Sequence, residues 1–336
     1  MIETAVVILN YNGKHFLQQF LPGVIAHSGT AKIIVADNAS TDDSVSFLKA
    51  NFSNHVEIIL LDSNRGYCGG YNAALKQVEA TYYVLLNSDV EVTPGWIDPV
   101  INLFRQDQSI AAAQPKILSY QTRNEFEYAG AGGGFIDSLG YPFCRGRIFN
   151  SFEKDNGQYN DTRQIFWATG ACLFIRASVF HQHNGFDEDF FAHMEEIDLC
   201  WRIQQTGMKI FYTGSSHVYH VGGGTLAKSN PRKTYFNFRN GLSLLVKNLP
   251  TTQLFWKIPL RLLLDWVAAA KFLITGSTAD AWAVAKAHGS FIKNLGRDYS
   301  KRSLPNQTPI GTIHKGMLLI EYYLKGKRKF SDLRNQ

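Results

Sequence analysis

Short apolar runs alternate with amphipathic segments through the first third of the chain. The runs are rich in β-branched and aromatic residues, which favours strands at residues 4–9, 32–36, 56–61 and 82–86. Between them, apolar residues recur at helical spacing, as in Phe16, Phe20 and Val24. This alternation predicts an α/β fold with a mostly parallel central sheet and helices on both faces.

Polar residues follow several of these runs. The first run ends in Asn10 and Asn12, the second in Asp37, and the fourth in Asn87 and Asp89. The carboxyl ends of parallel strands meet at one edge, where α/β proteins bind ligands. Two interpretations are open for each aspartate: Asp37 caps a helix or contacts a ligand, and Asp89 is a turn residue or binds a metal beside a diphosphate.

Length and composition predict a folded enzyme. The 336 residues with 45% hydrophobic content are enough for a full core. The four cysteines are far apart and form no C-x-x-C pair, so we expect packing roles and a reducing compartment. The first strand begins within a few residues of the N-terminus, so no signal peptide is expected.

The composition and the predicted secondary structure of the chain change at two points. Residues 119–164 are polar, aromatic and Gly-rich, which indicates an excursion at the edge of the sheet. After Asn230 strand signals disappear, and helices are expected to the end of the chain. We therefore predict two domains, residues 1–229 and residues 230–336.

One helix of the second domain, at residues 256–274, is amphipathic. Lys257, Arg261, Asp265 and Lys271 share about a third of its circumference, and the remainder is mostly apolar. Four charges argue against a membrane span. Two interpretations are open: a helix in a membrane interface with its basic residues among anionic head groups, or a core helix that packs against residues 279–295.

The net charge of +6 comes from 34 basic and 28 acidic residues, and basic residues gather in the C-terminal tail. This tail is either a solvated face or a contact for anionic lipid. Nucleic acid is disfavoured as a partner because aromatic residues do not alternate with the basic ones.

Five motifs, taken together, resemble the inverting glycosyltransferases of family 2, in particular their bacterial rhamnosyltransferase-like branch. They are V-V-I-L-N-Y-N-G at residues 6–13, A-D-N-A-S-T-D at 36–42, N-R-G-Y-C-G-G-Y-N at 64–72, L-N-S-D-V at 86–90 and M-E-E-I-D-L-C-W-R at 194–202. The resemblance covers about residues 2–224. It implies a GT-A fold, Rossmann-like, followed by the helical appendage.

The resemblance also implies a nucleotide-sugar site. Asp37 is expected to accept a hydrogen bond from N3–H of uracil or thymine, which suits a dTDP- or UDP-linked donor. Arg65 can bind phosphate, and Gly66 allows close approach of the backbone. The other residues expected at the donor are Asn10, Asn12, Asn64, Asn72, Asn87 and Gly170. The absence of G-x-G-x-x-G after the first strand argues against a nicotinamide dehydrogenase.

The expected cofactor is a divalent cation, Mg²⁺ or Mn²⁺. Asp89 corresponds to the last acid of the family's metal-binding triplet, whereas Asn87 stands where many members carry aspartate. Such ions need only one or two carboxylates beside the phosphates. His220, next to three glycines, is either a further metal ligand or a structural residue.

The catalytic base is expected in Glu195-Glu196-Ile197-Asp198. An inverting transfer needs one carboxylate to take the proton of the acceptor hydroxyl. By position, Glu196 matches the family's aspartate, with Glu195 and Asp198 as the other candidates. The alternative is that all three are the acidic first turn of a helix, where the helix dipole stabilises them.

The sequence thus predicts an inverting glycosyltransferase that moves a sugar, with rhamnose one option, to a glycan or lipid-linked acceptor in bacterial surface polysaccharide synthesis. Nucleotide sugars are cytoplasmic metabolites, so we expect a cytoplasmic enzyme held peripherally at the inner face of the membrane. The alternatives are a catalytically inactive nucleotide-sugar-binding protein, which Asn87 would permit, and a nucleotidyltransferase, which the lack of a basic Gly-rich loop after the first strand disfavours.

Overall fold

The first half of the chain forms the predicted alternation of strands and helices. The computed structural model describes residues 2–222, 230–302 and 310–333. Its first elements are β1 (Thr4–Asn10), α1 (Lys14–His27), β2 (Lys32–Asp37), α2 (Ser44–Phe52), β3 (Glu57–Leu60), α3 (Gly66–Leu75), β4 (Tyr82–Asn87), β5 (Val90–Val92), α4 (Asp98–Gln106) and β6 (Ile110–Ser119). The strands expected at residues 4–9, 32–36, 56–61 and 82–86 are β1 to β4, so this part of the prediction is confirmed.

The central sheet is mixed rather than wholly parallel. Its order is β11-β13-β6-β12-β4-β1-β2-β3, with β5 paired to β13. β1, β2, β3 and β4 pair in parallel, whereas β12 (Cys172–Arg176) runs antiparallel between β4 and β6. β13 (Lys209–His220) is parallel to β6 and antiparallel to β11 (Thr162–Ile165).

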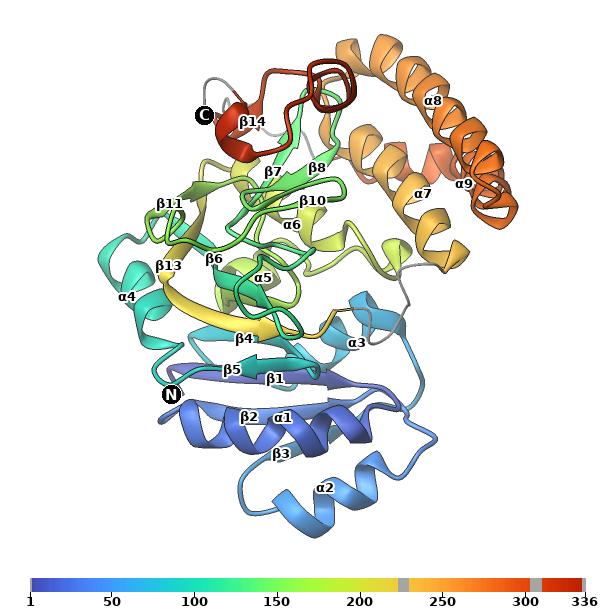
Figure 1. Ribbon diagram of the computed structural model, residues 1–336. Helices are drawn as coiled ribbons and strands as arrows, with labels where there is room; N and C mark the ends of the chain where they lie inside the picture. Colours follow the sequence, from blue (N-terminus) through green and yellow to red (C-terminus); the bar gives the residue numbers. More distant parts are fainter. Residues whose placement is uncertain (1, 223–229, 303–309, 334–336) are drawn as a thin grey trace.

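Both faces of the sheet are covered, which explains the continuous apolar runs. In β1, Val6 and Ile8 point into the core that contains α1 and α4, while Ala5 and Val7 point into the core on the opposite face. Figure 1 shows α1 and α2 lying over the β1–β3 end of the sheet. The four cysteines are free and buried, as predicted.

The Gly-rich stretch forms a second, smaller sheet. Its order is β10-β9-β8-β7-β14, with β7 at Gly134–Asp137, β8 at Pro142–Cys144, β9 at Arg147–Ile148, β10 at Ser151–Phe152 and β14 at Ile313–His314. β14, a strand of two residues, lies in the C-terminal region, where we expected helices to dominate, and it is an exception within that mainly helical region. The strand forms because a short segment, without helical periodicity, finds the open edge of β7.

Helices form most of the C-terminal half. α5 (Ala177–Gln182), the 3₁₀ turn η1 (Glu188–Phe190) and α6 (Glu195–Gln205) lead into β13, and α7 (Pro231–Asn248), α8 (Thr251–Ile274) and α9 (Thr278–Ser300) form a separate layer. Short turns η2 (Ile320–Leu324) and η3 (Phe330–Asp332) follow. Leu244 and Leu245 of α7 belong to the main hydrophobic core, so the helical layer shares that core with the first domain.

Three of the four residues in the charged stripe of α8 face the protein, whereas Lys271 is exposed. Lys257 and Arg261 are 8% and 4% exposed, and the Arg261 guanidinium donates to the carbonyl of Leu139 at 2.6 Å and stacks 3.8 Å above the ring of Tyr141. Asp265, which is also buried, lies 3.3 Å from His288 of α9.

Placing Lys257 and Arg261 among lipid head groups was therefore wrong. The turn between β7 and β8 presents the carbonyl of Leu139, which accepts from Arg261, and the ring of Tyr141, which stacks on its guanidinium. Packing of this side of α8 against α9 is the interpretation that the structure supports. Within the described ranges, no helix is long and apolar enough to cross a membrane.

Candidate active site

The polar residues that end β1 and β2 meet at one edge of the sheet. Asn10 pairs with Asp37 in the strand register, and its side chain donates to Oδ1 of Asp37 at 2.9 Å. Ser40 donates to both Asp37 oxygens, through its backbone N–H at 2.9 Å and its hydroxyl at 2.6 Å. Asp37 is 2% exposed, so its present partners are protein groups, and contact with a nucleotide base stays a prediction.

Asn12 holds the loop after β2. Its side-chain oxygen accepts hydrogen bonds from the backbone N–H groups of Thr41 and Asp42, at 2.7 and 3.2 Å. The sequence suggested Asn12 as a donor ligand, and the structure places it at the exposed rim of the same edge. In the structure Asn12 connects the loop that follows β1 to the loop that follows β2.

Asn38, which the sequence prediction missed, organises the loop before α3. It is buried, donates to Asn64 at 3.1 Å and to the carbonyl of Gly66 at 3.0 Å, and accepts from the N–H of Arg65. The Arg65 guanidinium is half-exposed and pairs with Asp62 at 3.0 Å, which holds the pKa of that carboxyl below its usual range. Asp62 accepts from Nε and Nη2 of Arg65, so a diphosphate would share the guanidinium with this carboxylate or displace it.

Gly66 is required by its surroundings. It begins α3 with φ of +67°, and a Cβ there would lie 2.7 Å from the ring of Phe191. The next residue, Tyr67, donates its hydroxyl to the carbonyl of Gly170 at 2.8 Å. Gly66, Gly170 and the loop that carries Phe191 therefore lie together, as the motifs suggested.

Asn72 and Asn87 anchor neighbouring segments. The Asn72 amide donates to the carbonyl of Phe186 at 2.8 Å and accepts from the N–H of the same residue at 3.0 Å, so it ties α3 to the segment before η1. Asn87 ends β4, and its N–H donates to the carbonyl of Ala171 at 3.0 Å. A contact of either side chain with the donor stays a prediction.

Asp89 and His220 converge although they lie far apart in the sequence. Nε2 of His220 is 3.2 Å from Oδ1 of Asp89, and its Nδ1 is 3.4 Å from Oε2 of Glu127, which the sequence prediction missed. All three side chains are buried. Burial opposes a charge on His220, but the carboxylates of Glu127 and Asp89 outweigh it and raise its pKa to about 10.

These residues fit a divalent cation that is completed by substrate. Asp89 and His220 present an oxygen and a nitrogen to the same point, and Glu127 stands behind the imidazole, as carboxylates do behind metal-binding histidines. Across the described residues, no group of three or more His, Cys, Asp or Glu side chains is placed to hold a metal ion by itself. Mg²⁺ and Mn²⁺ commonly take few protein ligands and several phosphate or water oxygens.

A strained loop delivers the two glutamates. Phe191, His193 and Met194 have positive φ values of 63°, 69° and 71°, which are unfavourable for side chains of this size. The amide of Asn240 on α7 holds the loop, because it donates to the carbonyls of Phe190, Ala192 and His193 at 3.0, 2.9 and 2.7 Å. The helical layer thereby positions the candidate base.

Glu195 and Glu196 begin α6 with buried, unpaired oxygens. Glu195 is buried, Glu196 is partly exposed, and Oε2 of each lacks a hydrogen-bond partner. Burial raises the pKa of Glu196 to about 7, and burial together with the neighbouring Glu196 raises the pKa of Glu195 as well. Such a carboxylate binds protons near neutral pH, which is the property of a general base.

Asp198 does not share this environment. It is fully buried, and its oxygens accept from Arg202 and Lys247 at 2.8 Å and from Asn248 at 2.9 Å. These contacts and the full burial of Asp198 favour a structural role over the catalytic one that the sequence suggested, and a catalytic role for Asp198 stays a prediction. In the structure it joins α6 to α7.

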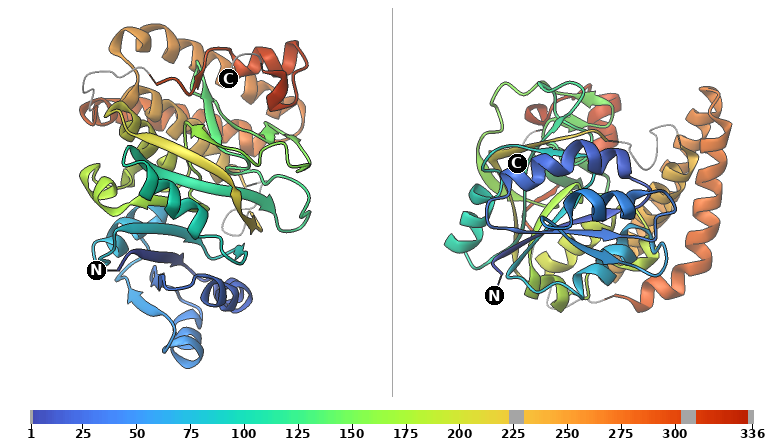
Figure 2. Two further views of the ribbon diagram at one scale, coloured as in Figure 1. Left: turned by 90° about the vertical axis from the view of Figure 1, so that its left-hand side faces the viewer. Right: turned by 90° about the horizontal axis from the view of Figure 1, so that it is seen from below.

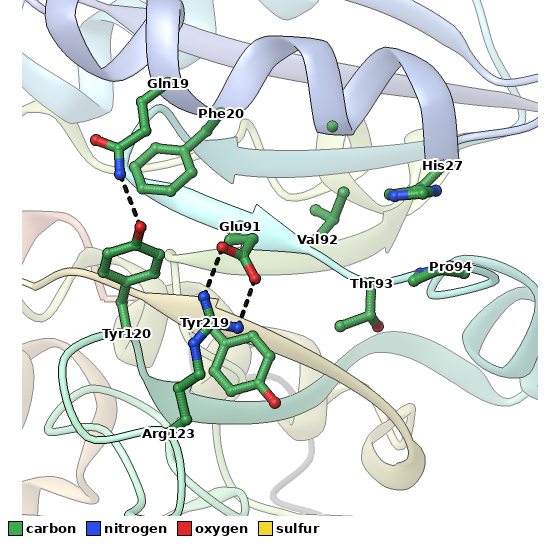
Figure 3. Close-up of a pocket in the computed structure, with 11 residues that line it drawn as sticks. Gln19, Phe20, His27, Glu91, Val92, Thr93, Pro94, Tyr120, Arg123 and Tyr219 are labelled. Carbon is green, nitrogen blue, oxygen red and sulfur yellow. Dashed lines mark hydrogen bonds and ion pairs between the residues drawn. The ribbon is translucent and has the colours of Figure 1, made fainter.

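Two cavities flank the site. The first, of about 540 Å³, lies between α1, β5 and the end of β13. Glu91 and Arg123 form an ion pair there, at 2.8 Å, and Figure 3 shows the two side chains facing each other. Glu91 is thus one of the residues that line this pocket. The second, of about 650 Å³, adjoins the loop before the glutamates; aromatic and basic side chains line it, namely Phe191, Arg232, Tyr235, Phe236, Arg239 and Lys286.

The fold and the motifs together define a glycosyltransferase. The family model described as glycosyl transferase family 2 matches residues 5–183, more than half of the chain, and the chain belongs to that family. An N-acetylglucosaminyl-diphospho-decaprenol L-rhamnosyltransferase of Mycobacterium tuberculosis is 25% identical over 76% of this chain and 87% of its own length. The rhamnosyltransferase WbbL of Escherichia coli is 23% identical over 64% of this chain and 82% of its own.

Solved structures confirm the GT-A-like fold. TarS of S. aureus, residues 1–349, superposes with a TM-score of 0.56 at 14% identity, over 90% of this chain and 83% of that one. The mannosyltransferase PcManGT of Pyrobaculum calidifontis, solved with GDP-Man and Mn²⁺, gives a TM-score of 0.51 at 12% identity, over 88% and 75% of the two chains.

Proposed function

We propose that this glycosyltransferase is an inverting, metal-dependent enzyme that moves a sugar from a dTDP- or UDP-linked donor to a glycan or lipid-linked acceptor, with rhamnose as the first candidate sugar. The observation that carries the proposal is the pair of buried, unpaired oxygens of Glu195 and Glu196 beside the donor edge. A buried carboxylate with a free oxygen is costly unless it has a substrate to meet.

In the proposed reaction, Glu196 removes the proton of the acceptor hydroxyl while that oxygen attacks the anomeric carbon. The bond from that carbon to the diphosphate breaks, and the electron pair leaves with the nucleoside diphosphate. A divalent cation at Asp89 and His220 would supply Lewis-acid stabilisation of this leaving group. Asn240 keeps the base in place through the loop that it holds.

The cavity beside the glutamates supports a phosphorylated acceptor. Arg232, Arg239 and Lys286 line it, and none of its lining residues in the described part of the chain is a carboxylate, so it favours an anion. Its aromatic rings suit the apolar faces of sugars. The mycobacterial relative is named for an acceptor that carries a diphosphate on a polyprenyl chain. We propose the same acceptor class here, and work at the inner face of the membrane, where nucleotide sugars are available.

The test is a transfer assay with the full chain, a panel of dTDP- and UDP-sugars and a polyprenyl-diphosphate-linked N-acetylglucosamine, with Mn²⁺ or with a chelator. We expect one donor to be used, only with metal, and NMR of the product to show an inverted anomeric configuration. Retained configuration would overturn the mechanism. Donor binding without transfer to any acceptor would favour the inactive binding protein.

A further inference from the structure

The outer side of α8 is apolar and uncovered. Figure 2 shows α8 as the outermost helix, clear of the sheet. Its large apolar side chains that are more than half exposed are Phe255, Trp256, Leu263, Trp266, Val267, Leu273 and Ile274. A contiguous patch of this kind on a folded protein marks a binding surface for a protein or a membrane.

The orientation of α8 is fixed from the inside. The exposed residues recur at three- and four-residue spacing and share about a third of the circumference, opposite Lys257, Arg261 and Asp265. Turning the apolar side inward would remove Arg261 from the carbonyl of Leu139 and from the ring of Tyr141. The helix thus buries Lys257, Arg261 and Asp265 and presents its apolar side to the surroundings.

The charge around this surface has one sign. Between residues 251 and 300 there is no glutamate; Asp265 and Asp298 are buried, and Asp280 is partly buried and accepts from Thr234. The exposed charged residues of α8 and α9 are all lysines, namely Lys271, Lys286 and Lys293. Lys271 also reaches Tyr323 at 3.4 Å, next to the exposed Lys325.

We propose that α8, with the exposed side of α9, is a membrane-docking surface that inserts its apolar side chains between anionic head groups, with the lysines at its rim. Anionic lipid complements the positive rim, and tryptophan suits the boundary between head groups and acyl chains. A second copy of the chain would set these lysines against lysines of the same sign, which disfavours self-association through this face.

The membrane-docking surface would serve a lipid-linked acceptor, and this part of the inference rests on the proposed function. Lys286 lines the cavity beside Phe191, and Trp282, one turn earlier in α9, is 65% exposed. A docked molecule would therefore hold the cavity close to the membrane surface, where a lipid-linked phosphate emerges.

The experiment is flotation of the full chain with vesicles of phosphatidylcholine alone or mixed equally with phosphatidylglycerol. We expect binding to the mixed vesicles that weakens with salt, and much less binding to the neutral ones. The variant with Leu263→Glu and Trp266→Glu should lose binding by about tenfold or more, since each change removes an inserted apolar side chain.

The matched control is Leu60→Glu, which places the same charge at a leucine of similar exposure, 54% against 62% for Leu263, on the far edge strand β3. The control should bind as the wild type does. Equal flotation of the double variant and the wild type would overturn the proposal, as would a wild-type dimer in light scattering that the double variant abolishes without any vesicle binding.

Transfer to a water-soluble acceptor analogue separates the two proposals. The double variant should keep this activity while it loses transfer to the acceptor in vesicles. If no variant or wild-type protein transfers sugar but vesicle binding follows the expected pattern, the docking surface stands and the proposed function fails.

Discussion

His220 and Asp89 lie 3.2 Å apart at the edge of the sheet, and Glu127 approaches the other nitrogen of the same imidazole. The two carboxylates hold the pKa of His220 far above its ordinary value, at about 10, despite burial. A cation between Asp89 and His220 must therefore displace a proton, so metal binding should release protons near neutral pH.

Asp89→Asn should abolish transfer and metal-dependent binding of the nucleoside diphosphate while the fold remains intact, because it removes the anionic member of the metal pair. Calorimetry with Mn²⁺ and dTDP or UDP measures the binding. Asp98→Asn, at the exposed start of α4, is the control and should behave as the wild type. Full activity of Asp89→Asn would refute the metal assignment.

Glu127→Gln should weaken Mn²⁺ binding by about 10- to 100-fold, the usual effect of removing the carboxylate behind a metal-binding histidine. It should also lower the pKa of His220, since one of the two carboxylates that stabilise the imidazolium is lost. An NMR titration of His220 without metal checks the second effect. An unchanged His220 pKa would show that Glu127 has no electrostatic hold on the imidazole.

The sequence was sufficient to predict β1 to β4 and the polar residues at their carboxyl ends. The spacing of apolar residues, the β-branched residues and the polar residues at strand ends are local signals in the sequence. In the parallel pairing of β1 with β2, Asn10 lies opposite Asp37, as expected for two polar residues that end neighbouring strands. Asn38 had such a signal too, as an amide directly after a strand end. Glu127 had none, because it comes from the irregular Gly-rich stretch and reaches His220 only through the tertiary fold.

The sequence also could not show which side of α8 is buried. A helical pattern separates an apolar from a charged side, but burial depends on what each side meets. Here the partners of Arg261 are the carbonyl of Leu139 and the ring of Tyr141, which are far away in the chain. Likewise, nothing in the Glu195 to Asp198 segment shows that Asp198 alone meets Lys247.

Glu196→Gln should reduce kcat by about a hundredfold or more and leave the donor affinity nearly unchanged, as expected for a lost general base. Glu195→Gln is the matched comparison, and donor binding by calorimetry accompanies the rates. If Glu195→Gln is the damaging change, the base is Glu195.

The pH profile of kcat/KM should rise with a slope of one and level off above about pH 7, because only ionised Glu196 accepts the proton and burial raises its pKa to about 7. An ordinary glutamate, with a pKa of 4.5, would give a plateau from much lower pH. A profile that is flat from pH 5 to 8 would contradict the assignment. The measurement needs saturating metal at every pH.

The raised pKa of Glu196 also implies a stability cost at neutral and higher pH. The folded protein keeps a proton on this carboxyl up to about pH 7, whereas the unfolded chain releases it near its ordinary value of 4.5. Between these values the folded state binds more protons, so its free energy of unfolding falls as the pH rises.

Glu196→Gln removes this fall because the amide does not ionise, and the variant should melt at a higher temperature than the wild type at pH 8 but not at pH 4. Thermal unfolding at both pH values checks the difference. Gln18→Glu, an exposed substitution on α1, is a control that should show no such pH-dependent gain. Equal melting temperatures of Glu196→Gln and the wild type at pH 8 would show that ionisation of Glu196 costs the folded state no stability. The unpaired oxygen of Glu196 would then no longer indicate a site where stability is lost in favour of catalysis.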